Sequence, residues 1–340
     1  MDGVQAGVVV DAGGAVKMRL LAVLVAAALL APAASAGEEA AKPGRVYFVA
    51  PDGEDDNDGS MGRPFATIER AQRTIRQLKT NGRYPKGGVT VMIRGGRYPM
   101  APGLAFDEYD SGEPGSPVTW RAYRGEKPVF DGGWRVPGLK PVSDQAKLSQ
   151  IPPEARAGVR CCDVGEEGFA KDTSSGIRKT RAAKNRPPVD LYADGVWLKP
   201  VAFPVSRQGE WHLDEEAGML YVWPPEGCRE LVLSEFADVF IDARKLHDVR
   251  FGGLALEYGR CDAVKFLRCS NIHFARNVVR NFGRGGVVAT GARGLRLTGN
   301  VMSGFGGRAI SIAGGTGADG GAVSGNEVKD EGRRDFSKAD

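Results

Sequence analysis

Four arginines in the last quarter of the chain recur at a nearly constant interval, each directly after a glycine. They are Arg260, Arg284, Arg308 and Arg333. The planar guanidinium group of arginine binds carboxylates and sulfates through two parallel hydrogen bonds. If these side chains line one edge of the fold, we expect that edge to bind a polysaccharide with uronic acid or sulfate groups. The competing interpretation is that they extend into water and pair with neighbouring carboxylates.

Two carboxylates flank the first of these arginines, Glu257 on one side and Asp262 on the other. Hydrolysis of a glycosidic bond uses two carboxyl groups roughly 5–10 Å apart. We therefore name Glu257 and Asp262 as the catalytic candidates. The alternative is that both carboxylates neutralise Arg260.

A wider repeat surrounds the glycine–arginine pairs. Apolar residues occupy the first and third places of the segments 249–254, 272–277 and 295–300, which follow one another at a constant interval. A second short apolar run follows each glycine–arginine pair, at 263–266, 286–289 and 309–312. About three short strands fit in such a unit, with no room for an ordinary helix, and a fixed period of this length is typical of a solenoid. We predict an all-β chain folded as a parallel β-helix.

Three asparagines occupy the same place of successive repeats, at Asn277, Asn300 and Asn326. In stacked coils, amide side chains at one turn can hydrogen-bond from coil to coil, because neighbouring strands lie roughly 4.8 Å apart. Asparagine is also common in turns for its tolerance of left-handed backbone. We predict a structural asparagine ladder with no catalytic role.

The first 36 residues are predicted to be an over-extended start followed by a signal peptide. Met18 and Arg19 precede the apolar run 20–30, which ends in the small residues Ala34, Ser35 and Ala36. A charged start, a short apolar core and a small-residue cleavage site are typical of secretory signals, and the run is too short to span a bilayer. We expect a secreted protein, extracellular or periplasmic, with no membrane segment after cleavage.

The remaining chain divides into three predicted regions. Residues 37–132 are expected to form an N-terminal cap and the first coils, with an amphipathic helix at about 65–79. Residues 133–230 interrupt the solenoid, with loops over 137–188, a hairpin around Asp194-Gly195 and a second strand pair further on. Residues 231–340 are expected to form regular coils, incomplete at the C-terminus.

Composition limits the classes of partner and cofactor. A net charge of +4 is too small to suggest nucleic-acid binding, and the five cysteines and three histidines show no metal-site spacing. The cysteines could form one disulfide bond in an oxidising compartment. The acidic turn 52–59 invites a calcium interpretation, but Phe65 stands where a twelve-residue calcium loop needs glutamate. We expect a solvated turn there and no cofactor, with a weak calcium site as the alternative.

Several motifs resemble those of one group of proteins. YFVAPDG at 47–53, RPFATI at 63–68 and RGGRY at 94–98 resemble the opening of secreted right-handed parallel β-helix proteins of the pectin-lyase-like superfamily. GEWHLD at 209–214 and GMLYVWPP at 218–225 are similar to a motif of its glycoside-hydrolase-like branch, which includes xylanases, fucosidases and β-xylosidases. The resemblance implies a right-handed parallel β-helix with an N-terminal capping helix and a small β-hairpin insertion.

The resemblance also implies that the chain is cut short. Members of that branch carry further coils that hold their catalytic carboxylates, whereas this sequence ends at Asp340 after about four coils. No catalytic residue is therefore carried over from the family. We predict a carbohydrate-active protein of glycoside hydrolase type acting on plant or algal polysaccharide. If the further coils are needed for catalysis, we expect this chain to be inactive. The alternatives are a non-catalytic glycan-binding or surface protein, and a polysaccharide lyase, for which Lys265 is the available base.

Overall fold

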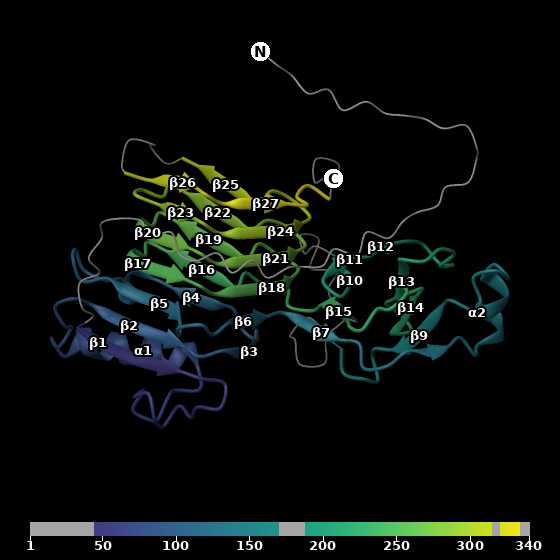
Figure 1. Cartoon of the computed structure of the whole chain (residues 1–340), viewed down its shortest axis with the longest axis horizontal. Coiled ribbons are helices and arrows are strands. Elements are labelled where there is room, and N and C mark those ends of the chain that lie inside the picture. The colour runs from purple at the N-terminus through teal and green to yellow at the C-terminus, as the bar shows by residue number, and fades with distance from the viewer. Residues whose placement is uncertain (1–43, 170–187, 315–319, 334–340) are drawn as a thin grey trace, which may run out of the picture. The chain divides into compact units, whose positions relative to one another are not determined.

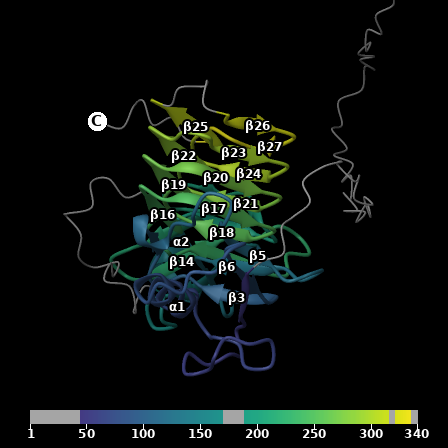
Figure 2. The same cartoon turned by 90° about the vertical axis from the view of Figure 1, so that its left-hand side faces the viewer.

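The structure is a computed structural model that describes residues 44–169, 188–314 and 320–333. The predicted signal segment, residues 1–36, lies outside the described residues. Most of the described chain after residue 240 consists of short parallel strands that rise in a regular stack, as Figures 1 and 2 show. The expected all-β parallel β-helix is confirmed.

Three parallel sheets form the walls of the β-helix. Sheet 1 contains β1 (Arg45–Val49), β2 (Val89–Ile93), β5 (Val118–Ala122), β17 (His247–Gly252), β20 (Ser270–Ala275), β23 (Arg296–Thr298) and β26 (Ala322–Ser324). Sheet 2 contains β4 (Leu104–Phe106), β16 (Ile241–Arg244), β19 (Val264–Leu267), β22 (Val287–Thr290) and β25 (Ile310–Ala313). Sheet 3 contains β3 (Gly96–Pro99), β6 (Pro128–Asp131), β18 (Ala255–Gly259), β21 (Val278–Phe282), β24 (Val301–Phe305) and β27 (Glu327–Lys329).

Each regular coil passes through sheet 2, then sheet 1, then sheet 3. The backbone partners recur at the interval that the apolar segments predict, as in Val264 with Val287 and Val287 with Ile310. The apolar members of each strand point inward and are fully buried, among them Phe251, Phe266 and Phe274. Apolar residues at equivalent positions of successive coils stack on one another and bury a continuous core, which a single coil could not form alone.

The asparagine ladder is confirmed. Asn277 and Asn300 are almost completely buried, and Oδ1 of Asn300 accepts the backbone N–H of Asn277 at 2.9 Å. Nδ2 of Asn300 donates to Oδ1 of Asn326 at 2.8 Å and to the carbonyl of Phe274 at 2.9 Å. The side chains thus satisfy buried backbone groups at the turn between sheets 1 and 3.

The capping helix is α1 (Ile68–Thr80), which begins three positions later than the predicted 65–79. It begins at Ile68 because the side chain of Thr67 accepts the backbone N–H of Arg70, an N-cap that fixes the first turn. Ala71 and Ile75 are buried against the first coils. A short 3₁₀ helix, η1 (Glu108–Asp110), lies against α1.

An insertion leaves the β-helix after β6 and returns at β16. Four antiparallel strands form one of its sheets: β7 (Gly133–Arg135), β15 (Leu231–Ser234), β10 (Leu191–Ala193) and β11 (Val196–Trp197). The second sheet contains β8 (Lys140–Pro141), β9 (Arg160–Asp163), β14 (Met219–Val222), β13 (Glu210–Asp214) and β12 (Lys199–Pro200). Insertion and β-helix belong to one compact unit.

Both predicted hairpins of the insertion are present. Asp194 and Gly195 form the tight turn between β10 and β11 with positive φ values of 47° and 82°, and β13 pairs antiparallel with β14. The prediction of loops over 137–188 is wrong in part, because β8, β9 and the short helix α2 (Gln145–Gln150) lie there. β9 forms by pairing with β14, a contact between segments far apart in sequence that local alternation does not reveal.

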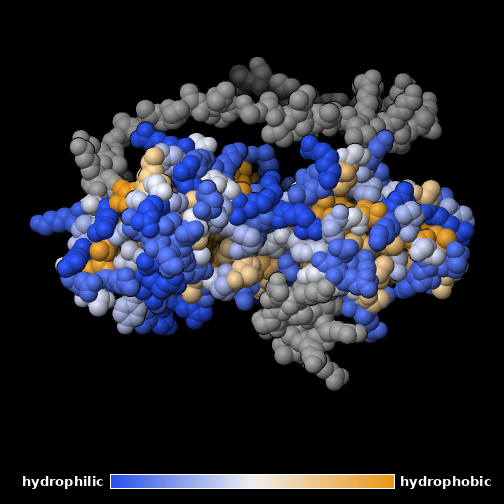
Figure 3. All heavy atoms as spheres, turned by 90° about the horizontal axis from the view of Figure 1, so that it is seen from below, coloured by the Kyte–Doolittle hydropathy of each residue, from blue (hydrophilic) through white to orange (hydrophobic). Residues whose placement is uncertain are grey.

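The described surface is mostly hydrophilic on the face shown in Figure 3, with scattered apolar residues. No helix among the described residues is long and apolar enough to cross a membrane. All five cysteines fall within the described residues and are free thiols.

Candidate functional site

The four predicted arginines all lie at one corner of the β-helix, where sheet 3 turns into sheet 2. Arg260, Arg284 and Arg308 lie one, two and three residues after β18, β21 and β24, and Arg333 lies four residues after β27. We call Arg260, Arg284, Arg308 and Arg333 the arginine corner. The expectation that they share one edge agrees with this placement.

The four arginines do not stack directly above one another. The backbone partner of Gly259 is Phe282, and that of Phe282 is Phe305, which fixes the period of the coils. The glycine–arginine pair recurs at an interval one position longer than this period, so Arg284 and Arg308 each move one position further along the corner than the arginine below. The backbone positions of these arginines therefore form a slanted row along the corner.

The glycines of this corner are there for packing. A Cβ on Gly283 would lie 2.5 Å from the carbonyl oxygen of Arg260, and one on Gly286 would clash with that of Ala309. Such contacts are shorter than van der Waals separation, so only glycine lets successive coils approach this closely. At Gly259 and Gly283 the repeated glycine thus reflects close packing between coils, and only the arginines remain as candidates for binding.

The corner arginines differ in exposure. Arg308 is exposed and Arg260 and Arg284 are half-buried. The Nη2 of Arg333 donates to the carbonyl of Gly304 on β24 at 2.7 Å. Its guanidinium carbon lies 5.3 Å from the ring centroid of Trp197, a distance at which cation–π attraction is effective.

Glu257, the first catalytic candidate, is 6% exposed and forms an ion pair with Arg280 of the next coil at 2.9 Å. Arg280 therefore lies on the outer face of sheet 3, as the backbone neighbour of Glu257, and is not part of the arginine corner. Burial alone would lower the pKa of Arg280, but Glu257 more than offsets that and raises it. The pair stays charged across the pH range in which the carboxylate is ionised.

Asp262, the second catalytic candidate, has two partners. Its Oδ1 accepts the backbone N–H of Gly285 at 2.9 Å, and its Oδ2 lies 3.1 Å from Nζ of Lys265. Glu331 makes the corresponding contact on another coil, accepting the N–H of Ala309. These contacts give Asp262 a structural task at the corner, and the catalytic role of Glu257 and Asp262 stays a prediction.

A closer neighbour of Glu257 than Asp262 is Asp131, which sequence reasoning missed. The two are backbone partners on adjacent coils, and Asp131 is 5% exposed. Arg97 lies 2.6 Å from Asp131, and Arg135 also pairs with it. The sequence carries no sign of this pair because the whole insertion separates the two residues along the chain.

The insertion contacts sheet 3 beside this carboxylate pair. Nδ2 of Asn281 donates to the carbonyl of Gly195 at the hairpin tip at 3.1 Å. The rings of Tyr192 and Tyr258 meet edge to face with centroids 5.3 Å apart. Burial raises the pKa of the Tyr258 phenol, so it is protonated and can donate a hydrogen bond at neutral pH.

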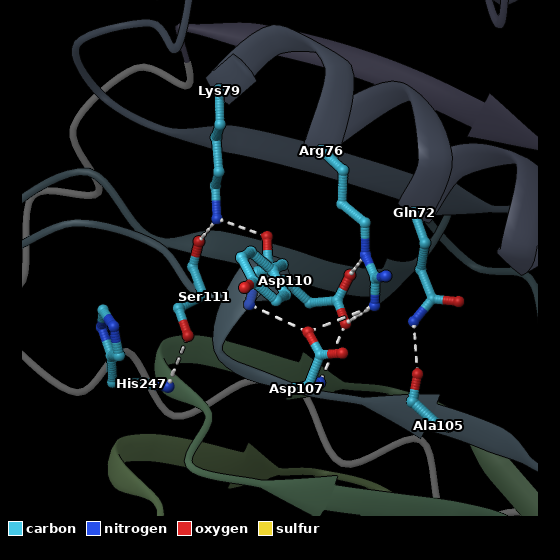
Figure 4. A network of polar contacts seen from close by, with 9 residues as sticks. Gln72, Arg76, Lys79, Ala105, Asp107, Asp110, Ser111 and His247 are labelled. Carbon is cyan, nitrogen blue, oxygen red and sulfur yellow. Dashed lines mark hydrogen bonds and ion pairs between the residues drawn. The ribbon is translucent and has the colours of Figure 1, made fainter.

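A separate cavity of 340 Å³ lies at the end of the capping helix. Its polar network is shown in Figure 4, where Lys79 donates to backbone carbonyls of η1 and Ser111, and Arg76 holds the buried Asp110 at 2.6 Å. Burial lowers the pKa of Lys79. Because its hydrogen bonds are to the cap's own backbone, the network fastens η1 to α1.

The predicted acidic turn uses its carboxylates locally. Asp55 accepts the backbone N–H groups of Ala66 and Thr67, and Asp58 accepts that of Ser60. Within residues 44–169, 188–314 and 320–333, no group of three histidine, cysteine or acidic residues is arranged to hold a metal ion.

Comparison with known proteins gives partial likenesses. No family model matches the chain. The Bacillus subtilis (strain 168) protein YwoF, described as uncharacterized, is 34% identical over 89 residues, which are 26% of this chain and 16% of that protein. The chain thus matches less than one fifth of that relative's length.

Among solved structures, a protein described as a glycoside hydrolase has a TM-score of 0.45 and 15% identity, covering 77% of this chain and 73% of its own. The complex of XylC with xylose has a TM-score of 0.44 and 13% identity, covering 84% and 62%. A rhamnogalacturonan lyase has a TM-score of 0.31 and 16% identity, covering 85% and 63%. Likenesses at these levels do not assign an activity.

Proposed function

We propose that this chain is a secreted carbohydrate-active β-helix protein that binds an acidic polysaccharide along the arginine corner. The observation that supports the proposal is the slanted row formed by Arg260, Arg284 and Arg308 on successive coils. Glu257 forms an ion pair with Arg280, and Asp262 forms one with Lys265. The corner arginines recur at intervals of roughly one coil, about 4.8 Å.

A row of this kind suits a polyanion better than a single small anion. Each guanidinium can form a two-hydrogen-bond contact with a carboxylate or sulfate, and several weak contacts along one chain add up. Because the corner is partly exposed, added salt is expected to weaken the binding. The apolar run 20–30 and the small residues that follow it support secretion, which would place the protein where polysaccharides are found.

The experiment compares corner variants in their binding to polygalacturonate by isothermal calorimetry. Arg308→Gln is expected to lower the affinity about threefold, and Arg284→Gln with Arg308→Gln about tenfold, since exposed charge contacts contribute modestly. Arg296→Gln is the matched control, an exposed arginine on sheet 1 of the same β-helix. Equal losses in the control and the corner variants would contradict the proposal.

Glycoside hydrolysis is the second candidate function. The observation that favours it is the juxtaposition of Glu257 and Asp131, whose strands lie about 4.8 Å apart, close to the separation that retaining glycosidases use. Both carboxylates are nearly buried and already engaged in ion pairs with arginines, which opposes direct contact with a substrate. Release of reducing sugar from xylan or pectate that is lost in Glu257→Gln, with folding retained, would establish hydrolysis.

A further inference from the structure

The hairpin tip of the insertion faces a small space on sheet 3. Gly195 lies at the turn between β10 and β11 with φ of 82° and carries no side chain. A Cβ placed on Gly195 would lie 3.7 Å from Oη of Tyr258, 3.9 Å from Nη1 of Arg280 and 3.9 Å from Nδ2 of Asn281. These are ordinary van der Waals distances, so the space beside Gly195 can hold an atom.

All three groups around that space are hydrogen-bond donors. Tyr258 is kept protonated by its raised pKa, Arg280 is permanently charged, and the amide nitrogen of Asn281 has a second hydrogen besides the one given to Gly195. In the described part of the chain, neither Oη of Tyr258 nor Nη1 of Arg280 has an acceptor within hydrogen-bond distance. Three converging donors, of which only Asn281 already has an acceptor, match an anionic group.

Tyr258 and Asn281 are 3% and 4% exposed, whereas the side chain of Arg280 is 43% exposed, so the space reaches the surface on the side of Arg280. The buried side-chain atoms without partners include Nε of Arg280 but neither its Nη1 nor Oη of Tyr258. Because these two atoms are unpaired and are not among the buried ones, they reach solvent. A ligand group would therefore approach from the side of Arg280.

Nearby carboxylates point elsewhere. Asp194, the other turn residue, accepts the backbone N–H groups of Arg229 and Glu230. Glu257 takes Nη2 of Arg280 at 2.9 Å and leaves Nη1 available. Glu230 and Glu257 both act to raise the pKa of Tyr258, although burial is the larger cause.

We propose that Tyr258, Arg280 and Asn281 form a binding site for one carboxylate or sulfate group of a sugar, which we call the hairpin-tip site. It deepens the function proposed above and rests on it. Tyr258 and Asn281 lie one residue beyond Glu257 and Arg280 on β18 and β21, and the arginine corner begins directly after these strands. A sugar acid bound at the hairpin-tip site would continue along the corner.

The main experiment fills the space without removing a donor. Gly195→Ala would place a methyl group among the three donors. Gly209→Ala is the matched control, because Gly209 lies in the same insertion with φ of 83° and no atom within 4 Å of its Cβ position. Both variants carry the same backbone strain, about 1 kcal/mol. Thermal unfolding is used to check that both variants fold.

The probes are a short oligogalacturonate and its methyl-esterified form, which keeps the sugar and loses the charge. The wild type and Gly209→Ala are expected to bind the acid about tenfold more tightly than the ester, measured by calorimetry. Gly195→Ala, Tyr258→Phe and Arg280→Lys are expected to reduce this preference to less than threefold. Arg280→Lys keeps the charge beside Glu257, so it tests the hydrogen-bond geometry separately from the ion pair.

The outcomes separate this inference from the proposed function. If the acid preference persists in Gly195→Ala while the Arg284→Gln and Arg308→Gln variant loses affinity for polygalacturonate, the hairpin-tip site is wrong and the arginine corner stands. If the wild type binds neither probe, the proposed function is wrong. In that case the hairpin-tip site is tested by measuring Tm with and without sodium sulfate. A rise in Tm in the wild type that is absent in Gly195→Ala would support the site, and an equal response of both proteins would overturn it.

Discussion

Replacing Asn300 by alanine is expected to destabilise the β-helix strongly. The side chain is 1% exposed and makes four hydrogen bonds, two as donor and two as acceptor. Alanine would leave the backbone N–H of Asn277, itself fully buried, without its acceptor. An unpaired buried donor costs about 1–3 kcal/mol, and each further lost hydrogen bond about 0.5–1.5 kcal/mol.

Asn300→Ala is therefore expected to lower the free energy of unfolding by about 3 kcal/mol. Urea titration followed by circular dichroism measures this loss. Thr298→Ala is the control, since Thr298 is half-buried and lies two residues away on β23. Asn326→Ala should cost less than Asn300→Ala, because Asn326 is partly exposed. A loss below about 0.5 kcal/mol for Asn300→Ala would refute the view that the ladder satisfies buried backbone groups.

Three further predictions concern single contacts. Thr67→Ala removes the N-cap of α1 and should lower the free energy of unfolding by about 1 kcal/mol in urea titration, whereas no change would show that the cap is dispensable. Gly286→Ala should destabilise by about 1–3 kcal/mol, seen as a lower Tm, because its Cβ would clash with the carbonyl oxygen of Ala309; an unchanged Tm would contradict the close coil packing. The N–H of Ala217 and then Lys147 hold the pKa of Asp214 below its usual range, so its contribution to stability is present above about pH 4 and is lost as pH falls through the lowered value. Asp214→Asn should therefore flatten the fall in Tm below about pH 4, and an unchanged acid profile would show that Asp214 does not contribute.

The coil architecture could be predicted because its signal is local and repeated. Alternating apolar residues at a constant interval mark the strands, and the asparagines mark one turn of each coil. The same reasoning predicted the capping helix, since the spacing of Ile68, Ala71 and Ile75 depends only on neighbours in sequence. The predicted hairpin at Gly195 was likewise a local turn signal.

The candidate site could be predicted only in part. The sequence predicted that the arginines share one edge, but the one-position difference between their spacing and the structural period shifts them along the corner. Glu257 pairs with Arg280 because the two are backbone partners in that register. The sequence alone does not give the register, so it suggested Arg260 as the partner of Glu257. The neighbourhood of Glu257 and Asp131 depends on where the insertion leaves and rejoins the β-helix, which no local pattern encodes.

The hairpin-tip site shows the same limit. Its donors come from two strands of sheet 3 and its opening from a glycine in the insertion, so three separate segments must be placed before it exists. A glycine in a tight turn is explained by backbone conformation alone when read from sequence. Only the packing of that turn against Tyr258 and Asn281 shows that the missing side chain also leaves room.

The most direct test of the central claim is the affinity of the wild-type protein for polygalacturonate and for its fully methyl-esterified form, measured by calorimetry at low and high salt. Binding through the arginine corner predicts that the acid polymer binds at least tenfold more tightly at low salt and that most of this difference disappears at high salt. Equal affinity for both polymers, or an acid preference unaffected by salt, would contradict the claim.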